Sequence, residues 1–253
     1  MQLVSTPSPN FNERRERLDM LVLHYTGMET GADALDRMCD ADAEVSAHYM
    51  IEEGGTICQL VPEEKRAWHA GVSSWQGDQD LNSRSIGIEI VNGGHNFPLE
   101  SGELPPYPPA QIDAVIALCR DILDRNAIPQ HRIVGHSDIA PDRKDDPGEH
   151  FPWQKLSEHG IGFWPEPAGT GQLMGKGLEI GASGPAVERL QTSLRDIGYG
   201  VDVNGIYGDT TVHVVRAFQR RWCPDRVTGE ADLTSMTLIE RVAEFARSST
   251  RAA

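Results

Sequence analysis

An unbroken apolar run constrains the fold of this chain more than any other feature of its sequence. Residues 20–23 are all apolar, and the run ends at His24 and Tyr25, just before Gly27. A strand with one wet face would alternate apolar and polar residues, which this run does not do. We therefore expect a central strand that other layers of the fold cover on both faces.

Strand and helix patterns alternate after this run, which is typical of an α/β domain. A hairpin is expected where Gly54 and Gly55 separate two short apolar runs. Pro109 suits the first turn of a long amphipathic helix. Residues 1–18 are polar and are expected to form a lead-in arm. The expected strands are 19–27, 85–92 and 132–138, the hairpin is 46–62, and the expected helices are 32–40 and 108–126.

The distribution of charge divides the chain into two parts. Residues 1–175 carry 13 Lys and Arg against 28 Asp and Glu, whereas residues 176–253 carry 10 of each. We expect domains at 1–164 and 178–253 joined by the Pro/Gly-rich linker 165–177. An acidic surface argues against nucleic acid and anionic membranes as partners. No run of 18 apolar residues occurs, so no membrane span is expected.

The second domain is predicted to be a small all-α module of three helices. Its apolar residues recur at helical spacing in three segments, and Asx/Gly turns precede the second and third of them. The two turns make a weak internal repeat. The expected helices are 184–199, 210–222 and 233–248, and the turns are 203–209 and 227–232.

The four cysteines and the N-terminus bear on the cellular compartment. Cys58 and Cys119 lie in apolar runs and no CxxC occurs, so all four cysteines are expected to be free thiols. Residues 1–18 lack the apolar core of a secretory signal. The expectation is a cytoplasmic protein, with the cell envelope or periplasm as the alternative if a leader is missing from the given sequence.

Two histidines and an aspartate are the leading candidates for a metal site. His24 ends the apolar strand, and His136 and Asp146 bracket a polar segment much further along the chain. Two imidazoles and one carboxylate suit a catalytic zinc, because the fourth position stays open for water. Spacing alone leaves alternatives: another carboxylate could be the third ligand, or another histidine could replace one of the two. These alternatives are Asp138, Asp142 and Asp145, and His48 and His69.

Glu89 and Lys144 are the candidate catalytic residues. Glu89 interrupts the apolar strand 85–92, where burial would raise its pKa and suit it to act as a general base. The alternative is a strand whose second face is wet. Lys144 precedes Asp146 by two residues and could stabilise an oxyanion. The alternative for Lys144 is an ordinary surface lysine.

The long loop 67–84 is rich in Gly, Ser and Asn, and loops of this length usually carry function. Its aromatic residues Trp68 and Trp75, together with His69, could line a groove for a sugar or a peptide. The alternative is that Trp68 closes the edge of the core. Trp68, His69 and His48 are the candidate substrate-binding residues.

Several motifs of the first domain together resemble the zinc-dependent N-acetylmuramoyl-L-alanine amidases of the AmpD/AmiD type, the amidase-2 family. The resemblance covers roughly residues 18–156 and keeps the order of the motifs. It implies a mixed central sheet flanked by helices, zinc ligands at His24, His136 and Asp146, a catalytic Glu89, and an assisting Lys144. The motifs are VLHYTG, SAHYMI, QLVPEEKRAWHAG, LNSRSIGIEIVN, GHSDIAPDRKDDPG and FPW.

The second domain resembles the three-helix peptidoglycan-binding domain 1 family over about residues 178–240. The family pattern GxFGxxTxxAVxxFQ appears here as GIYGDTTVHVVRAFQ, with Tyr207 in place of the aromatic Phe. His213 and Val214 are less usual. The alternative is a helical module used only for packing or dimerisation.

The two resemblances together imply a Zn²⁺ hydrolase that acts on peptidoglycan or muropeptides in cell-wall turnover or recycling. It would cleave the amide bond between N-acetylmuramic acid and L-alanine. The alternatives are a non-catalytic peptidoglycan-recognition protein and a cytoplasmic amidase restricted to anhydro-muropeptides. The retained ligand set favours the enzyme, and the appended binding domain favours a polymeric substrate.

Overall fold

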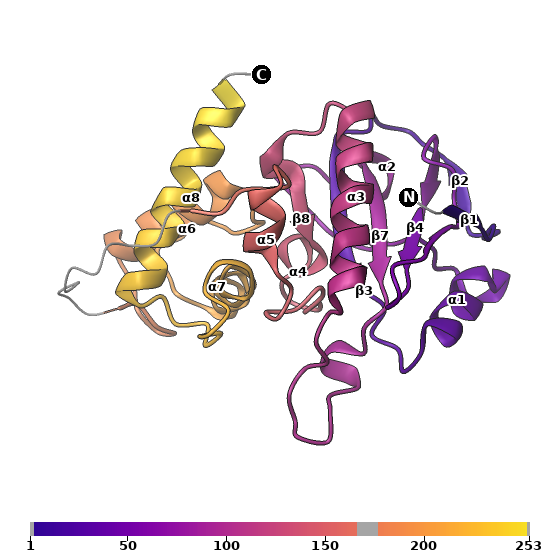
Figure 1. Ribbon diagram of the computed structural model, residues 1–253. Coiled ribbons are helices and arrows are strands. Elements are labelled where there is room, and N and C mark those ends of the chain that lie inside the picture. Colours follow the sequence, from indigo (N-terminus) through magenta and orange to yellow (C-terminus); the bar gives the residue numbers. More distant parts are fainter. Residues whose placement is uncertain (1–2, 166–176, 252–253) are drawn as a thin grey trace.

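A mixed sheet of six strands flanked by helices forms the centre of the first domain, and this confirms the expected fold class (Figure 1). The computed structural model describes residues 3–165 and 177–251, so the expected linker 165–177 lies almost wholly outside the described residues. The strands lie in the order β1 (Leu3–Ser5), β5 (Ile57–Gln59), β4 (Tyr49–Ile51), β7 (Ser85–Ile90), β3 (Met20–Tyr25) and β8 (Ile133–Gly135).

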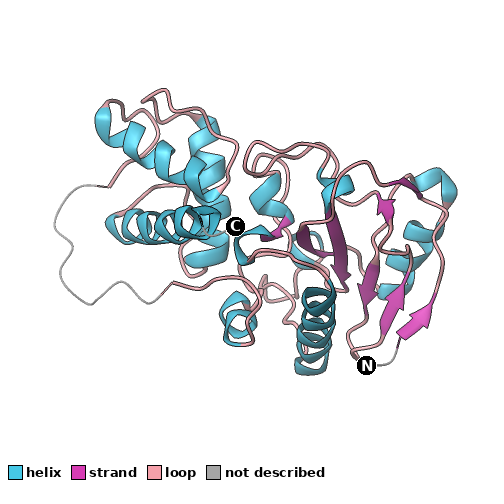
Figure 2. Ribbon diagram, turned by 90° about the horizontal axis from the view of Figure 1, so that it is seen from above, coloured by secondary structure: helices cyan, strands magenta, loops and turns pink. Residues whose placement is uncertain are grey.

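Helices surround this sheet and make up the C-terminal part of the chain (Figure 2). Two short antiparallel strands, β2 (Phe11–Glu13) and β6 (Lys65–Ala67), form a second, separate sheet. The helices are α1 (Gly31–Cys39), α2 (Leu81–Arg84), α3 (Pro109–Arg125), α4 (His136–Ile139), α5 (Trp153–Glu158), α6 (Pro185–Ile197), α7 (Asp209–Trp222) and α8 (Leu233–Arg251), with 3₁₀ turns at Ala41–Ala43, Gly94–Asn96 and Gln130–Arg132.

The apolar run at residues 20–23 forms β3 and is fully buried, as expected for a strand covered on both faces. β3 pairs in parallel with β7 on one side and with β8 on the other. Leu21 and Leu23 share a hydrophobic cluster with α3 on one face of the sheet. Met20 and Val22 belong to a second cluster on the opposite face. The side chain of His24 follows Met20 and Val22, because residues two apart point to the same face of a strand.

The hairpin prediction is confirmed, because β4 and β5 are antiparallel with Ile51 opposite Ile57. The lead-in arm prediction is wrong, since β1 pairs with β5 and β2 pairs with β6. Asn10 fixes the segment between β1 and β2 through side-chain bonds to the carbonyls of Asp40 and Val45. The strand expected at 132–138 ends early, at Gly135. The chain there turns into α4, because the Asp138 carboxylate accepts the backbone N–H of Gly135 at 2.9 Å.

The C-terminal module contains the three expected helices, α6, α7 and α8, and it confirms the internal repeat. Two buried glutamines hold the two turns in the same way. Gln191 accepts the backbone N–H of Gly205, and its amide donates to the carbonyl of Ile206. Gln219 accepts the backbone N–H of Gly229, and its amide donates to the carbonyl of Glu230. Each repeat therefore consists of a helix and the turn after it, and a glutamine of the helix hydrogen-bonds to the backbone of that turn.

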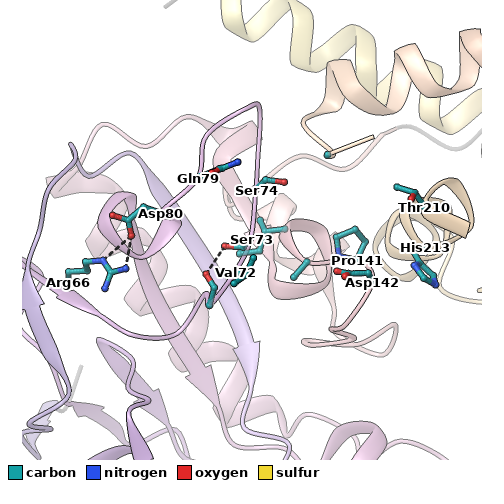
Figure 3. Close-up of a pocket in the computed structure, with 14 residues that line it drawn as sticks. Arg66, Val72, Ser73, Ser74, Gln79, Asp80, Pro141, Asp142, Thr210 and His213 are labelled. Carbon is teal, nitrogen blue, oxygen red and sulfur yellow. Dashed lines mark hydrogen bonds and ion pairs between the residues drawn. The ribbon is translucent and has the colours of Figure 1, made fainter. Parts of the chain in front are cut away.

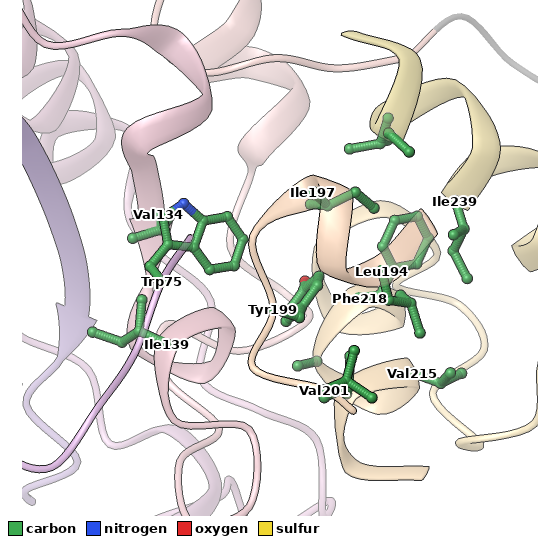
Figure 4. Close-up of a cluster of buried hydrophobic side chains, with 14 of the residues drawn as sticks. Trp75, Val134, Ile139, Leu194, Ile197, Tyr199, Val201, Val215, Phe218 and Ile239 are labelled. Atoms are coloured by element: carbon green, nitrogen blue, oxygen red, sulfur yellow. The ribbon is translucent and has the colours of Figure 1, made fainter. Parts of the chain in front are cut away.

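The two parts of the chain share one hydrophobic core (Figure 4). Trp75, from the loop between β6 and β7, is 1% exposed and packs edge-on against Tyr199, with their ring centroids 5.1 Å apart. Its indole N–H donates to the carbonyl of His131. The ring also fills the space where a Cβ of residue 198 would lie, which requires Gly198. Trp75 is therefore a core residue between the modules, and the cavity that it lines has a volume of only about 20 Å³.

All four cysteines are free thiols, as expected, and Cys58 and Cys119 are buried. Among the described residues, no helix combines the length and the apolar character needed to cross a bilayer.

Candidate metal centre and active site

Three side chains converge at the carboxyl ends of β3 and β8. His24 Nδ1 lies 3.0 Å from His136 Nδ1 and 3.0 Å from Asp146 Oδ2. The distance between His136 Nδ1 and Asp146 Oδ2 is 3.1 Å. All three residues are buried, at 1%, 4% and 5% exposure. The structure thus brings together, in one nearly equilateral triangle, the three residues that were the leading candidates for metal ligands.

The backbone supports this triangle. His24 is the fifth residue of β3, whereas His136 opens α4 directly after β8. The N–H of Ser137 donates to the carbonyl of Asp146 at 2.9 Å, which ties the segments of the second and third residues together. The triangle is therefore built from the ends of two adjacent parallel strands and one loop anchored to them.

The outer nitrogen of the His136 ring determines its tautomer. Nε2 lies 3.2 Å from the backbone carbonyl of Ala70, which can only accept a hydrogen bond. Nε2 therefore carries the proton, and Nδ1 presents a lone pair to the triangle.

A chain of hydrogen bonds determines the tautomer of His24 as well. The Ser85 hydroxyl donates its one proton to the carbonyl of Leu81, so its oxygen accepts from His69 Nε2 at 3.2 Å. Burial lowers the pKa of His69 well below its usual value, so the ring is neutral and its Nδ1 is a lone pair. That lone pair accepts the proton of His24 Nε2 at 3.0 Å. His24 therefore also presents Nδ1 to the triangle.

The donor set fits a divalent metal ion. Two nitrogen lone pairs and a carboxylate oxygen about 3 Å apart repel one another unless a cation lies between them. Burial lowers the pKa of His24 to about 4, and the electrostatic effect of the nearby His136 is the second cause. The low pKa favours the neutral ligand form over a protonated ring. Tetrahedral zinc with bonds of about 2.0–2.2 Å separates its ligand atoms by roughly 3.3–3.6 Å, slightly more than the 3.0–3.1 Å seen here.

The alternative ligands lie elsewhere. Asp138 is turned toward the Gly135 N–H and accepts from Tyr199 and Arg221. Asp145 forms an ion pair with Arg220. Among the described residues, the one group of metal-ligating side chains that converges is His24, His136 and Asp146.

Glu89 lies beside the triangle on the neighbouring strand, where its Cα is the register partner of the Cα of His24. Burial, reinforced by the charge of Asp146, raises the pKa of Glu89 well above its usual value, and the charge of Lys144 opposes this. Within the described residues, the buried Oε2 atom of Glu89 has no hydrogen-bond partner. The carboxyl group is thus available for proton transfer, and Lys144 lies near enough to act on it electrostatically.

A cavity of about 370 Å³ opens in front of Glu89. Thr26 and Met28 line it just beyond the end of β3, Arg37 lines it from α1, and Phe97 lines it from the loop after β7. Sequence reasoning missed these residues, because nothing in the local pattern of α1 or of the loop marks a lining residue. Arg37, Thr26 and Glu89 provide the polar side chains of a lining that is otherwise apolar.

The three candidate substrate-binding residues differ in position. Trp68 is half-buried, and its indole N–H lacks an acceptor in the described part of the chain. His48 is completely buried, and its Nδ1 accepts the backbone N–H of Gly87. His69 is 6% exposed and lies behind His24. Only Trp68 keeps part of its side chain exposed, whereas the two histidines support the site from behind.

A second cavity, of about 600 Å³, lies between the two modules (Figure 3). Ser73 and Asp142 line it from the first domain, and Thr210 and His213 line it from α7. The Arg66–Asp80 ion pair closes one side. Neither Glu89 nor any of the three triangle residues lines this cavity, whereas Glu89 lines the smaller one.

Comparison with protein families matches both parts of the chain. Residues 14–149 match the N-acetylmuramoyl-L-alanine amidase family, amidase-2. Residues 183–238 match a family described as a putative peptidoglycan-binding domain. The first match contains the triangle and Glu89, and the second contains all of α6 and α7 and the start of α8.

Individual relatives agree with these matches. The chain is 38% identical to the amidase AmiD of Escherichia coli in an alignment of 243 positions, which covers 90% of this chain and 83% of that protein. It is 36% identical to the 1,6-anhydro-N-acetylmuramyl-L-alanine amidase AmpD of Enterobacter cloacae over 59% of this chain and 86% of that protein.

Solved structures extend the likeness to the whole architecture. AmiD of E. coli, in complex with anhydro-N-acetylmuramic acid-L-Ala-D-gamma-Glu-L-Lys, superposes with a TM-score of 0.78 at 34% identity, over 93% of this chain and 98% of that chain. AmpDh3 of Pseudomonas aeruginosa superposes with a TM-score of 0.74 at 30% identity, over 91% of this chain and 92% of that chain. The chain therefore belongs to the N-acetylmuramoyl-L-alanine amidase family.

Proposed function

We propose that this chain hydrolyses the amide bond between the lactyl group of N-acetylmuramic acid and the L-alanine of the peptidoglycan stem peptide. The convergence of two imidazole lone pairs and a carboxylate next to the unpartnered Glu89 carries this proposal. AmiD of E. coli, which matches this chain over nearly its whole length, is named for this reaction. We assign catalysis to residues 1–164, peptidoglycan binding to residues 178–253, and the linker to residues 165–177.

The proposed metal is zinc, held by His24 Nδ1, His136 Nδ1 and a carboxylate oxygen of Asp146. A mixed set of two nitrogens and one oxygen suits zinc better than it suits magnesium or calcium, which prefer oxygen ligands alone. When bound, zinc supplies a Lewis acid for the amide carbonyl and makes water a better nucleophile at neutral pH.

The protein supplies the proton transfers. Glu89, whose pKa burial raises, takes a proton from the attacking water as the new C–O bond forms. It returns that proton to the nitrogen of L-alanine as the C–N bond breaks, which leaves a carboxylate on the sugar and a free amine on the peptide. Lys144 donates to the former carbonyl oxygen while negative charge develops there.

The substrate is proposed to lie in the cavity in front of Glu89. The cavity between the modules is lined by Ser73 of the first domain and by Thr210 of the C-terminal module. This arrangement supports a polymeric substrate, because a long ligand there would contact both modules. We therefore propose intact peptidoglycan as the substrate and the cell envelope as the site of action. The cytoplasm is the alternative, with small muropeptides as substrates.

The test is to incubate purified protein with muropeptides and with intact sacculi, and to identify the released peptides by mass. We expect free L-alanine N-termini, loss of activity after chelation, and recovery with one equivalent of zinc. His24→Ala should lose the metal. An undiminished reaction after exhaustive chelation would exclude the metal mechanism, and binding without peptide release would indicate a recognition protein. Cell fractionation, and the ratio of sacculus to anhydro-muropeptide turnover, decide between envelope and cytoplasm.

A further inference from the structure

We infer that helix α7 of the C-terminal module positions the metal-ligand segments of the catalytic domain through two adjacent arginines, Arg220 and Arg221. The C-terminal module would then help to hold the metal ligands in position, in addition to binding the cell wall. This inference rests on the proposed metal site. α7 lies directly beside α4 and α5, which makes such contacts feasible (Figure 1).

Arg221 reaches into the catalytic domain and binds it at two points. Its Nη1 donates to Asp138 Oδ2 at 2.9 Å, and its Nη2 donates to the carbonyl of Ile133 at 2.9 Å. The side chains of Arg221 and Asp138 are 5% and 1% exposed. An ion pair this well excluded from water has a large effect when one partner is removed, because the other charge is left buried and unpaired.

The surroundings of Arg221 fix its orientation. Its guanidinium carbon lies 4.1 Å from the ring centre of Trp153, in the catalytic domain, and 4.5 Å from that of Trp222, in its own module. A second residue of the C-terminal module, Tyr199, donates its hydroxyl to Asp138 Oδ1 at 2.7 Å. Both oxygens of Asp138 are therefore occupied by the C-terminal module.

Asp138 in turn controls the position of His136. The helix α4 is only four residues long and begins with His136. Its start is held by Asp138 Oδ2, which accepts the Gly135 N–H while it also accepts from Arg221. Without Arg221 and Tyr199, a buried carboxylate would have one backbone donor and no counter-charge, so it would tend to turn toward water. The start of α4 would then lose the hydrogen bond from the Gly135 N–H to Asp138, and His136 would no longer be held in place.

Arg220 acts on the other ligand segment. It forms an ion pair with Asp145, the residue immediately before the ligand Asp146, and approaches Glu149 at 3.7 Å. Adjacent residues of a helix point in directions about 100° apart. Arg220 and Arg221 therefore grip separate segments, one carrying Asp146 and the other carrying His136.

The experiment measures zinc affinity in the full-length protein by competition with a chelator. Arg221→Gln, Tyr199→Phe and Arg220→Gln are compared with wild type and with Arg247→Gln, which removes an ion pair with Asp196 elsewhere in the same module. Loss of groups that orient metal ligands typically weakens metal affinity by about 10–100-fold. We expect a loss in this range for Arg221→Gln, smaller losses for Tyr199→Phe and Arg220→Gln, and none for Arg247→Gln.

Two further measurements separate positioning from ordinary packing. The absorption spectrum of the cobalt-substituted protein reports ligand geometry, and the melting temperature of the metal-free protein reports stability. A lower melting temperature with unchanged zinc affinity and an unchanged cobalt spectrum would overturn the inference. If Arg221→Gln does not fold, Tyr199→Phe and Arg220→Gln decide, since each leaves the Arg221–Asp138 pair intact. Failure of the wild type to bind zinc would instead refute the proposed function.

Discussion

His24 and Glu89 are register partners on two adjacent parallel strands, β3 and β7. Both side chains point to the face of the sheet opposite α3, since the leucines and isoleucines that alternate with them pack on α3. A proposed metal ligand and a proposed general base thus lie side by side on two paired strands inside the central sheet. Such a placement fixes their separation without any help from loops.

Replacing Glu89 with Gln should abolish turnover but spare the metal. Gln keeps the shape of the side chain and cannot accept the proton, so we expect a loss of about 10²–10⁴-fold in kcat. Zinc content should stay near one equivalent, because Glu89 is not in the triangle. Release of peptide from muropeptides and elemental analysis provide the two readouts. Glu100→Gln, at an exposed position, is the matched control, and near-normal release by the Glu89 variant would refute its role.

Replacing His69 with Ala should weaken the metal site from behind. The variant removes the acceptor of the His24 Nε2 proton, so His24 loses the bond that fixes its ring and its tautomer. We expect zinc affinity to fall about 10–100-fold, measured by chelator competition. Ser85→Ala, one step further along the same chain of bonds, should show a smaller loss. His159→Ala, on the surface, should show none, and equal affinities in all three variants would contradict the relay.

Stability should fall at acid pH because of His48. Its Nδ1 accepts the Gly87 N–H, and burial lowers its pKa from 6.5 to about 3. Below pH 6.5 the unfolded chain takes up a proton at His48 and the folded chain does not, so the free energy of unfolding decreases as the pH falls toward 3. The full contribution is present above pH 6.5.

The matched variant for this prediction is His48→Gln, which cannot titrate. Urea unfolding of metal-free wild type and variant should be compared at pH 7.5 and 4.5. The stability gap between them should shrink by roughly 3 kcal/mol at the lower pH, because pH 4.5 lies about two units below the unfolded pKa and each unit contributes about 1.4 kcal/mol. The same gap at both pH values would show that His48 is protonated in the folded protein.

Replacing Trp75 with Ala should destabilise both modules together. The indole fills a shared core against Tyr199 and is 1% exposed, so its removal is expected to cost about 3–5 kcal/mol. Val72→Ala, in the same loop but 89% exposed, should change stability by less than about 0.5 kcal/mol. Calorimetry of the full chain should show one transition moved to lower temperature. Two transitions, of which only one moves, would show that the modules unfold separately.

Local pattern was enough to predict most of the elements. The unbroken run at residues 20–23 indicated a doubly covered strand, and helical spacing indicated α3 and the three C-terminal helices, because burial imposes its period directly on the sequence. The hydrophobic pattern missed β1 and β2, because each strand has only three residues, all of them exposed, and therefore shows no alternation. It also extended β8 too far, because the turn into α4 depends on the side chain of Asp138 and not on hydrophobicity.

The chemistry of the site divides in the same way. The sequence by itself determined which residue types were available, and it nominated His24, His136 and Asp146 while leaving other carboxylates and histidines open. Only the tertiary structure decided that His69 stands behind His24, and that Arg221 holds Asp138 from another module. The reason is physical: ring orientation and charge pairing arise between segments 45 and 83 residues apart, and no local period records which distant groups a side chain will meet.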